Sequence, residues 1–197
     1  MDKKLTSMSF IAQNKIKIIG NGPSRNLYKQ IGTLSEHGCI CMCNYPDLPN
    51  PPYHRDYVSI VDRRTIDYLE KEKVQVYATI WTTPELKELT IKYKWTTPVL
   101  GVYKEKLMNA AATAAYHATQ DFDIIELYGC DALFSNVTTS HQDNYIHRHK
   151  RPANLHTRWR TYWEKVWATG KTFRIYCPQG TTPVEYGNNV EWRQVKE

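Results

Sequence analysis

Short apolar runs rich in β-branched residues alternate along the chain with segments in which apolar residues recur at helical spacing. The runs predict strands at Ile16–Gly20, Cys39–Cys43, Val58–Val61, Val76–Ile80, Ile124–Tyr128 and Phe173–Cys177. The segments between them predict helices at Asn26–Leu34, Thr65–Lys71, Tyr103–Thr119 and Leu155–Thr169. Strands alternating with helices are typical of α/β folds. We therefore expect a Rossmann-like, mostly parallel sheet with helices on both faces.

The chain has 197 residues and shows neither an internal repeat nor a break in composition, so we expect a single domain. Its core spans residues 16–178, and the C-terminal extension 179–197 is either a β-edge or an extended arm. Two segments look irregular. Tyr45–Arg55 carries four prolines and predicts a rigid loop. Gly129–Asn154 is long, polar and rich in histidine, which is typical of a lid or binding loop.

Composition narrows the classes of function. No run approaches the ~20 apolar residues of a membrane span, so we expect none. Five cysteines form no paired framework, which favours a reducing cytoplasm. The net charge of +6 fits an anionic partner such as nucleotide phosphate or nucleic acid, and it equally fits simple solubility. Nothing in the sequence indicates the oligomeric state.

The loop after the first predicted strand reads Gly20-Asn21-Gly22-Pro23-Ser24. Glycines let the backbone approach a ligand closely, and a helix N-terminus that follows favours an anion. The loop lacks both the GK[ST] of a phosphate-binding Walker loop and the G-x-G-x-x-G fingerprint. Its spacing fits a phosphate cradle and an ordinary strand-to-helix turn with Ser24 as N-cap about equally well.

Two further strand ends carry polar residues. Asn44 follows the second strand, where ribose or base contacts are commonly made in open α/β sheets. On that strand Cys39, Cys41 and Cys43 share one face, and we expect them to be small buried hydrophobes rather than metal ligands. Asp131 follows Tyr128-Gly129-Cys130 and predicts either a ligand contact or a cap of the following loop.

The segment from His141 to Arg160 is rich in histidine and arginine. Histidine can serve as a general base or a metal ligand near neutral pH. His147 and His149 have no carboxylate or cysteine at a diagnostic spacing, which argues against a metal site. The segment as a whole suggests a site for negative charge, and a solvated basic loop is the alternative for any one of its residues.

Taken in order, these motifs resemble the family 42 sialyltransferases and the related pterin diphosphokinase-type, MptE-like proteins. The family has a G-N-G-P-S loop, matched at Gly20 to Ser24, and a second strand ending in C-N, matched at Cys43-Asn44. A small-residue helix, a strand ending in S-G-x-D, a histidine-containing segment and a final strand ending in C-P follow. The corresponding stretch here runs over about residues 16–178.

The resemblance implies a metal-independent glycosyltransferase that needs no cofactor and uses a cytidine nucleotide-sugar as donor. Its nucleotide-binding residues would be Gly20, Asn21, Gly22, Ser24, Asn44 and Asp131. A lid histidine would deprotonate the hydroxyl of an unknown acceptor. His149 is the first choice for this base, and His147 fits the matching position as well. The family has a tyrosine just after its G-x-D, where this chain reads Ala-Leu-Phe, so Tyr145 from the lid is the candidate for that role.

Two alternatives remain open. A diphosphotransferase acting on a pterin or similar alcohol would use the same loop with ATP and magnesium. A non-enzymatic nucleic-acid-binding module would instead use the basic segment Arg148–Trp163.

Overall fold

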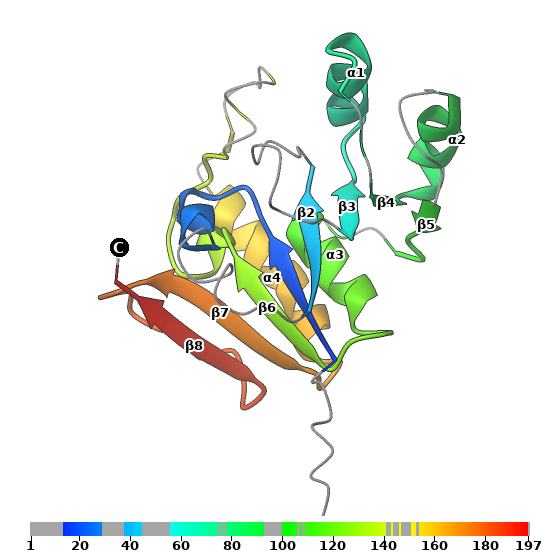
Figure 1. The fold of residues 1–197 in the computed structure, drawn as a ribbon. Coiled ribbons are helices and arrows are strands. Elements are labelled where there is room, and N and C mark those ends of the chain that lie inside the picture. Colours follow the sequence, from blue (N-terminus) through cyan, green and yellow to red (C-terminus); the bar gives the residue numbers. More distant parts are fainter. Residues whose placement is uncertain are drawn as a thin grey trace, which may run out of the picture.

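The computed structural model describes residues 14–28, 38–44, 56–74, 76, 78–92, 100–105, 107, 109–140, 143, 146, 151–152 and 154–196. Their elements, labelled in Figure 1 where there is room, are, in chain order, β1 Lys15–Ile19, η1 Pro23–Asn26, β2 Cys39–Cys43, β3 Tyr57–Ile60, α1 Arg63–Lys71, β4 Thr79–Thr82, α2 Pro84–Lys92, β5 Leu100–Val102, α3 Ala110–Ala118, β6 Ile124–Tyr128, η3 Asp131–Leu133, α4 Leu155–Trp167, β7 Thr172–Pro178 and β8 Val190–Val195.

The described strands form one eight-stranded sheet in the order β5-β4-β3-β2-β1-β6-β7-β8. Every neighbouring pair is parallel. The chain starts at β1, steps outward on one side as far as β5, and returns through α3 to β6 on the other side of β1 (Figure 1). The predicted α/β, Rossmann-like class is confirmed. The direction of winding reverses between β1 and β6, which makes this the topological switch point.

Helices cover both faces of the sheet, as predicted. On one face α3 and α4 pack in a single core cluster with the inward-facing residues of the central strands, among them Ile18, Cys41 and Leu127. On the other face α1 and α2 cover β3 and β4 through a second cluster that includes Ile66 and Leu86. The run of alanines in α3 lets this helix lie close to β1, β2 and β3.

Side-chain caps fix where two of the helices begin. The Asp62 carboxylate accepts a hydrogen bond from the Arg64 N–H at 3.0 Å and starts α1. The Asn109 Oδ1 accepts from the Ala112 N–H at 2.7 Å and starts α3. The predicted helix Tyr103–Thr119 therefore begins later than expected. Tyr103 instead follows β5 and is buried, with its hydroxyl donating to the Ser59 Oγ at 2.6 Å.

Other predicted boundaries also shift. The strand expected at Val76–Ile80 lies at Thr79–Thr82, and α2 and β5 were not predicted at all. The expected helix Asn26–Leu34 is preceded by the 3-10 turn η1, and most of its length lies outside the described residues, as does the proline-rich loop Tyr45–Arg55. The segment after Pro178 supplies β8, so the β-edge alternative is the one the chain adopts.

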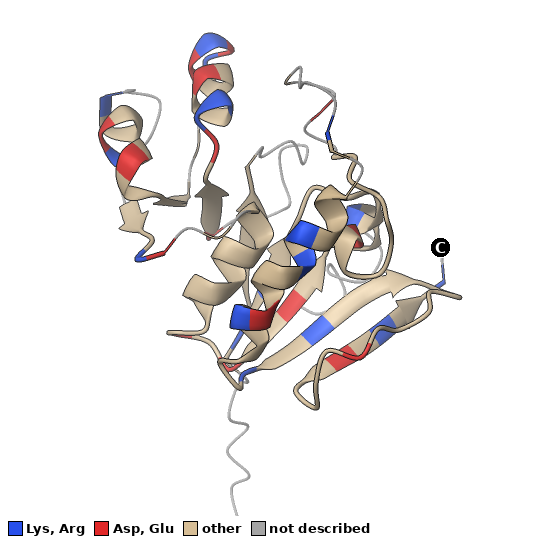
Figure 2. Cartoon of the chain, turned by 180° about the vertical axis from the view of Figure 1, so that it is seen from behind, with Lys and Arg blue, Asp and Glu red and all other residues tan. Residues whose placement is uncertain are grey.

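Lys and Arg positions and Asp and Glu positions are interspersed along the described elements (Figure 2). Several form ion pairs, for example Lys171 with Asp123 at 2.6 Å and Lys165 with Glu105. Within the described residues, no helix has the length and apolar character needed to cross a membrane.

Candidate functional site

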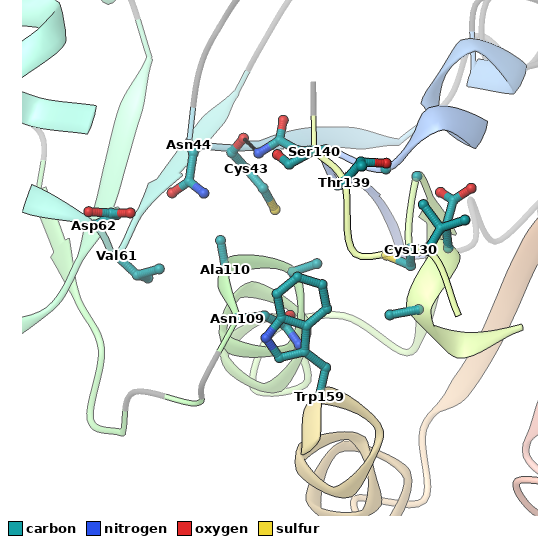
Figure 3. A pocket seen from close by; sticks show the side chains of 18 of the residues that line it. Cys43, Asn44, Val61, Asp62, Asn109, Ala110, Cys130, Thr139, Ser140 and Trp159 are labelled. Carbon is teal, nitrogen blue, oxygen red and sulfur yellow. Dashed lines mark hydrogen bonds between the residues drawn. The ribbon is translucent and has the colours of Figure 1, made fainter. Parts of the chain in front are cut away.

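A cleft of about 360 Å³ lies at the carboxyl ends of β1, β2, β3 and β6 (Figure 3). The loops after β1 and β6 form its floor, so the cleft lies at the topological switch point. Ligands of open α/β sheets bind in this crevice. The volume lies within the 300–1,000 Å³ that small-molecule sites usually occupy.

Glycines bring the ends of β1 and β6 into direct contact. The N–H groups of Gly20 and Gly22 donate to the carbonyls of Tyr128 and Gly129 at 2.7 and 2.8 Å. A Cβ on Gly20 would lie 2.5 Å from the Gly129 oxygen, and one on Gly22 would lie 2.1 Å from an oxygen of the Asp131 carboxylate. Gly129 itself has a φ of +65° and lies against Gly20. These three glycines are therefore required by the packing of the two loops.

Asp131 reaches back across the chain to the Gly-Asn-Gly-Pro-Ser loop. Its carboxylate accepts the Ser24 N–H at 3.1 and 3.2 Å and the Ser24 hydroxyl at 2.7 Å. Both residues are buried. The position at the start of η1 where a bound phosphate would lie is therefore occupied by the Asp131 carboxylate of the protein itself.

This arrangement corrects one of the interpretations made from sequence. Gly22, and not Ser24, is the N-cap of η1, and Ser24 lies inside the turn. Ser24 is also absent from the cleft wall and contacts Asp131 from behind it. Asp131 does line the cleft, but its carboxylate binds the neighbouring loop.

Two asparagines lie between the ends of β1 and β2. The Asn21 side chain donates to the Cys43 carbonyl at 2.8 Å and accepts from the Arg25 guanidinium at 3.3 Å. Asn44 has a φ of 61°, a left-handed conformation that costs a non-glycine residue energy, and it is held there by its N–H bond to the Ser59 carbonyl at 2.6 Å. Strained residues of this kind cluster at functional sites. Figure 3 shows the Asn44 amide directed into the cleft.

Two helices begin at the cleft. Asp62 and Arg63 at the start of α1 line it, and so do Asn109 and Ala110 at the start of α3. Neither helix carries an acidic residue in its first turn. The N-terminus of α3, capped by the neutral Asn109, directs its partial positive charge toward the cleft, whereas the Asp62 carboxylate offsets that of α1.

The opposite wall comes from α4 and from the segment that precedes it. Trp159 lies beside Asn109 at the cleft (Figure 3), and Thr139 and Ser140 border the other side. The guanidinium of Arg151 also lines the cleft and makes a two-pronged ion pair with Asp143, with both contacts at 2.6 Å. This pair ties the two sides of the predicted lid together.

Arg160 of α4 fixes the start of the same segment. Its Nε donates to the Ala132 carbonyl at 2.6 Å and its Nη2 to the Ser135 carbonyl at 2.9 Å. Arg151 and Arg160 therefore form hydrogen bonds and an ion pair within the chain, although the sequence analysis grouped them in a basic segment that suggested a site for negative charge.

The cleft also contains two thiols, Cys43 and Cys130. Burial raises the pKa of both well above the ordinary value, so both stay protonated and uncharged near neutral pH. Burial likewise raises the pKa of Cys41, which lies deeper in the core. The expectation that Cys41 and Cys43 are small buried hydrophobes is confirmed. Among the described residues, no group of three or more His, Cys, Asp or Glu side chains could hold a metal ion.

Of the nucleotide-binding residues predicted from sequence, Gly20, Asn21, Gly22, Asn44 and Asp131 line one cleft. The three predicted catalytic residues, Tyr145, His147 and His149, lie outside the described residues. The polar cleft residues Asp62, Arg63, Asn109, Thr139 and Ser140 were not singled out from the sequence, and Arg151 and Trp159 were named only as part of the basic segment. For Asn109, the signal was an N-cap residue directly before a run of alanines.

Comparisons with family models, with curated proteins and with solved structures found no match to this chain.

Proposed function

We propose that the chain is a nucleotide-sugar-dependent glycosyltransferase of sialyltransferase-like type that binds its donor nucleotide in the switch-point cleft. One observation carries the proposal. Three loops that follow β1, β2 and β6 bring Asn21, Asn44 and Asp131 from distant parts of the sequence to the same 360 Å³ cleft. These are the loops on which the sequence resemblance rests.

The groups around the cleft match the parts of a nucleotide. The amides of Asn21 and Asn44 can donate to and accept from a ribose or a pyrimidine edge. The Trp159 ring offers a surface for stacking. The N-terminus of α3 favours a phosphate, and Arg151 joins it only by exchanging its ion pair with Asp143.

The donor phosphate is therefore assigned to the N-terminus of α3. The Gly-Asn-Gly-Pro-Ser loop is a poorer phosphate site because the Asp131 carboxylate already accepts its Ser24 N–H. In this proposal Asp131 positions the loop that carries Asn21, and it does not contact the phosphate.

The transfer step follows from the resemblance. The acceptor hydroxyl gives its proton to the imidazole of His149, or of His147, as its oxygen attacks the anomeric carbon of the sugar. The bond from that carbon to the phosphate oxygen breaks, and the nucleotide leaves with the electron pair. Tyr145 would donate to the leaving phosphate. The N-terminus of α3 offsets part of the charge on the leaving phosphate, and the step as proposed uses no metal ion.

The nucleic-acid alternative has less support. Arg151 and Arg160, two of the cations in the basic segment, are engaged by Asp143 and by backbone carbonyls.

Calorimetry with cytidine, uridine, guanosine and adenosine mono- and diphosphates tests the proposal. The variant Asn44→Gly removes the amide and tolerates the φ of 61°. We expect it to weaken binding roughly ten- to hundredfold, the loss of one or two hydrogen bonds in a cleft. Asn188→Ala, an exposed residue of the loop before β8, is the matched control and should bind like the parent.

Failure of every nucleotide to bind would refute the proposal, and so would equal affinity of the parent and Asn44→Gly. Release of free sugar or transfer from the bound nucleotide-sugar without added divalent cation distinguishes the glycosyltransferase from a diphosphotransferase. Turnover that needs ATP and magnesium would favour the diphosphotransferase.

A further inference from the structure

The outer edge of the sheet at β8 has a defined hydrogen-bonding pattern. β8 pairs with β7 on one side and is the terminal strand of the described sheet. The carbonyls of Asn189 and Val195 accept hydrogen bonds on the β7 side, from Phe173 and Gln179. Because backbone groups alternate along a strand, those of Glu191 and Arg193 also face β7, and those of Val190, Trp192 and Gln194 face away from it.

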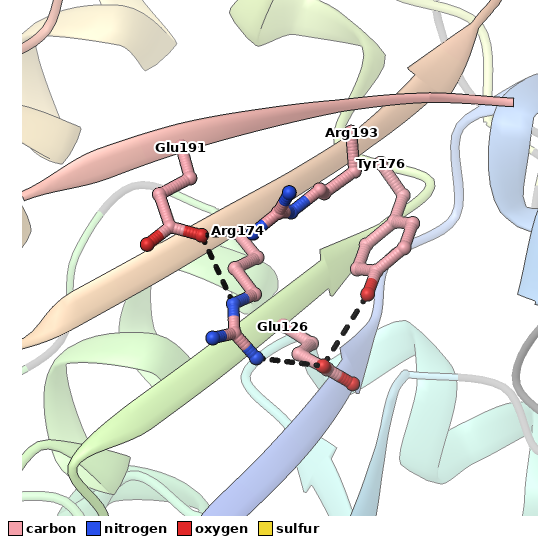
Figure 4. Close-up of polar contacts among 5 residues, drawn as sticks. All are labelled: Glu126, Arg174, Tyr176, Glu191 and Arg193. Carbon is pink, nitrogen blue, oxygen red and sulfur yellow. Dashed lines mark hydrogen bonds and ion pairs between the residues drawn. The ribbon is translucent and has the colours of Figure 1, made fainter. Parts of the chain in front are cut away.

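Side chains on this strand alternate in the same way. Glu191 and Arg193 lie on one face of the sheet, beside Arg174 and Tyr176 of β7 (Figure 4). The Glu191 carboxylate accepts from Arg174 at 3.1 Å and from Arg193 at 2.5 Å. Arg174 in turn lies 3.6 Å from the buried carboxylate of Glu126. Glu191 and Arg193 stay accessible, with 39% and 50% of their side chains exposed.

The sequence Val190-Glu191-Trp192-Arg193-Gln194 is complementary to itself in one antiparallel register. Two copies related by a two-fold axis at Trp192 would place Glu191 of each copy opposite Arg193 of the other. Trp192 would then form a hydrogen-bonded pair at the axis, and Val190 would lie opposite Gln194, bonded through the Val190 carbonyl alone because the Val190 N–H already donates to the Gly187 carbonyl at 3.2 Å. Val190, Trp192 and Gln194 are the residues whose backbone groups face away from β7. The two Glu–Arg pairs would be non-hydrogen-bonded, in which side chains approach most closely.

The neighbouring registers are worse for electrostatic reasons. Centring the axis on Glu191 places the two Glu191 carboxylates directly opposite each other, and centring it on Arg193 does the same for the two guanidinium groups. Centring it on Val190 or Gln194 leaves part of the strand without a partner. The register centred on Trp192 therefore places every residue from Val190 to Gln194 opposite a partner and pairs opposite charges twice.

We propose that β8 is a homodimer interface, in which two copies join their sheets by antiparallel β8–β8 pairing centred on Trp192. An isologous contact of this kind closes after two copies. The sheet's other edge is β5, with only three residues, and it offers no comparable strand for further growth. The charged residues on β8 thus select a second copy of this chain, whereas an uncharged edge strand would accept many partners.

Analytical ultracentrifugation of the full chain over a concentration series tests the interface. The parent should pass from one to two copies per particle as concentration rises. Glu191→Arg and Arg193→Glu each place like charges opposite each other twice, and each should weaken the dimer by at least about tenfold. Glu185→Arg makes the same charge change at an exposed residue of the loop before β8 and should dimerise like the parent.

Mixing the two single variants is the decisive step. A Glu191→Arg copy and an Arg193→Glu copy restore both opposite-charge pairs, so the equimolar mixture should regain the dimer that each variant has lost. This recovery also excludes misfolding as the reason for the loss. A parent that stays monomeric at every concentration, particles larger than two copies, or a mixture that stays monomeric would each overturn the proposal.

Discussion

Gly22→Ala tests how the two central loops fit together. The new methyl group would lie 2.1 Å from the Asp131 Oδ2 and 2.8 Å from the Gly129 oxygen, far inside contact distance. Gly22 has a φ of −70°, so the backbone itself accepts alanine without strain. The cost therefore arises from displacing the Asp131 carboxylate.

The magnitude follows from the contacts that are lost. Overpacking a dense site costs about 1–3 kcal/mol. Moving the carboxylate also breaks its charge-assisted bonds with the Ser24 N–H and hydroxyl, worth about 1.5–3 kcal/mol. We expect Gly22→Ala to lower the free energy of unfolding by about 3–5 kcal/mol, which is a large part of the 5–15 kcal/mol typical of a folded protein.

Urea unfolding followed by tryptophan fluorescence measures this loss. The matched control is Gly180→Ala, where no atom lies within 4 Å of the new Cβ and only the φ of +85° is unfavourable, a cost of about 1 kcal/mol. Combining Gly22→Ala with Asp131→Ala should cost less than the sum of the two single changes, because each removes the same contact. Strict additivity, or a Gly22→Ala variant as stable as Gly180→Ala, would refute the reasoning.

Two further predictions concern stability away from the loops. Arg160→Ala should lower the free energy of unfolding by about 2–3 kcal/mol because it removes two charge-assisted hydrogen bonds to the Ala132 and Ser135 carbonyls. The control Arg158→Ala, at an exposed residue of the same helix, should change it by less than about 0.5 kcal/mol. Equal effects of the two variants in urea unfolding would contradict this prediction. Burial lowers the pKa of His117 from 6.5, so the unfolded chain binds this proton more readily and stability should fall as pH drops below 6.5. Thermal melts in that range should show a weaker pH dependence for His117→Gln, and an unchanged pH dependence would argue against the assignment.

The sequence predicts an element correctly where the hydrophobic pattern of a segment is typical of the helix or strand that the segment forms. The strands at β2, β6 and β7 lie almost where the apolar runs placed them, because buried parallel strands read as continuous hydrophobic sequence. The three-residue β5 is too short to leave such a pattern. α2 begins at Pro84 and has few buried residues, so its apolar periodicity is weak.

The candidate site was predictable only in part. The strand-end motifs predicted a site at the carboxyl ends of the strands, and Asn21 and Asn44 both line the cleft there. The contact of Asp131 with Ser24 joins residues 107 positions apart, and local spacing carries no information about it. Gly129, with a φ of +65° and Gly20 against it, allows the two loops to touch, and local spacing does not predict this contact either.

The most direct test of the account is a nitrogen–proton correlation spectrum of the labelled protein, titrated with cytidine monophosphate. The largest amide shifts should lie at residues 20–22, 24, 44 and 129–131 and at the first turns of α1 and α3, with β5 and β8 unchanged. Asn44→Gly should lose these shifts at the same nucleotide concentration. Shifts that fall elsewhere on the sheet, or none with any nucleotide, would contradict a nucleotide site at the switch point.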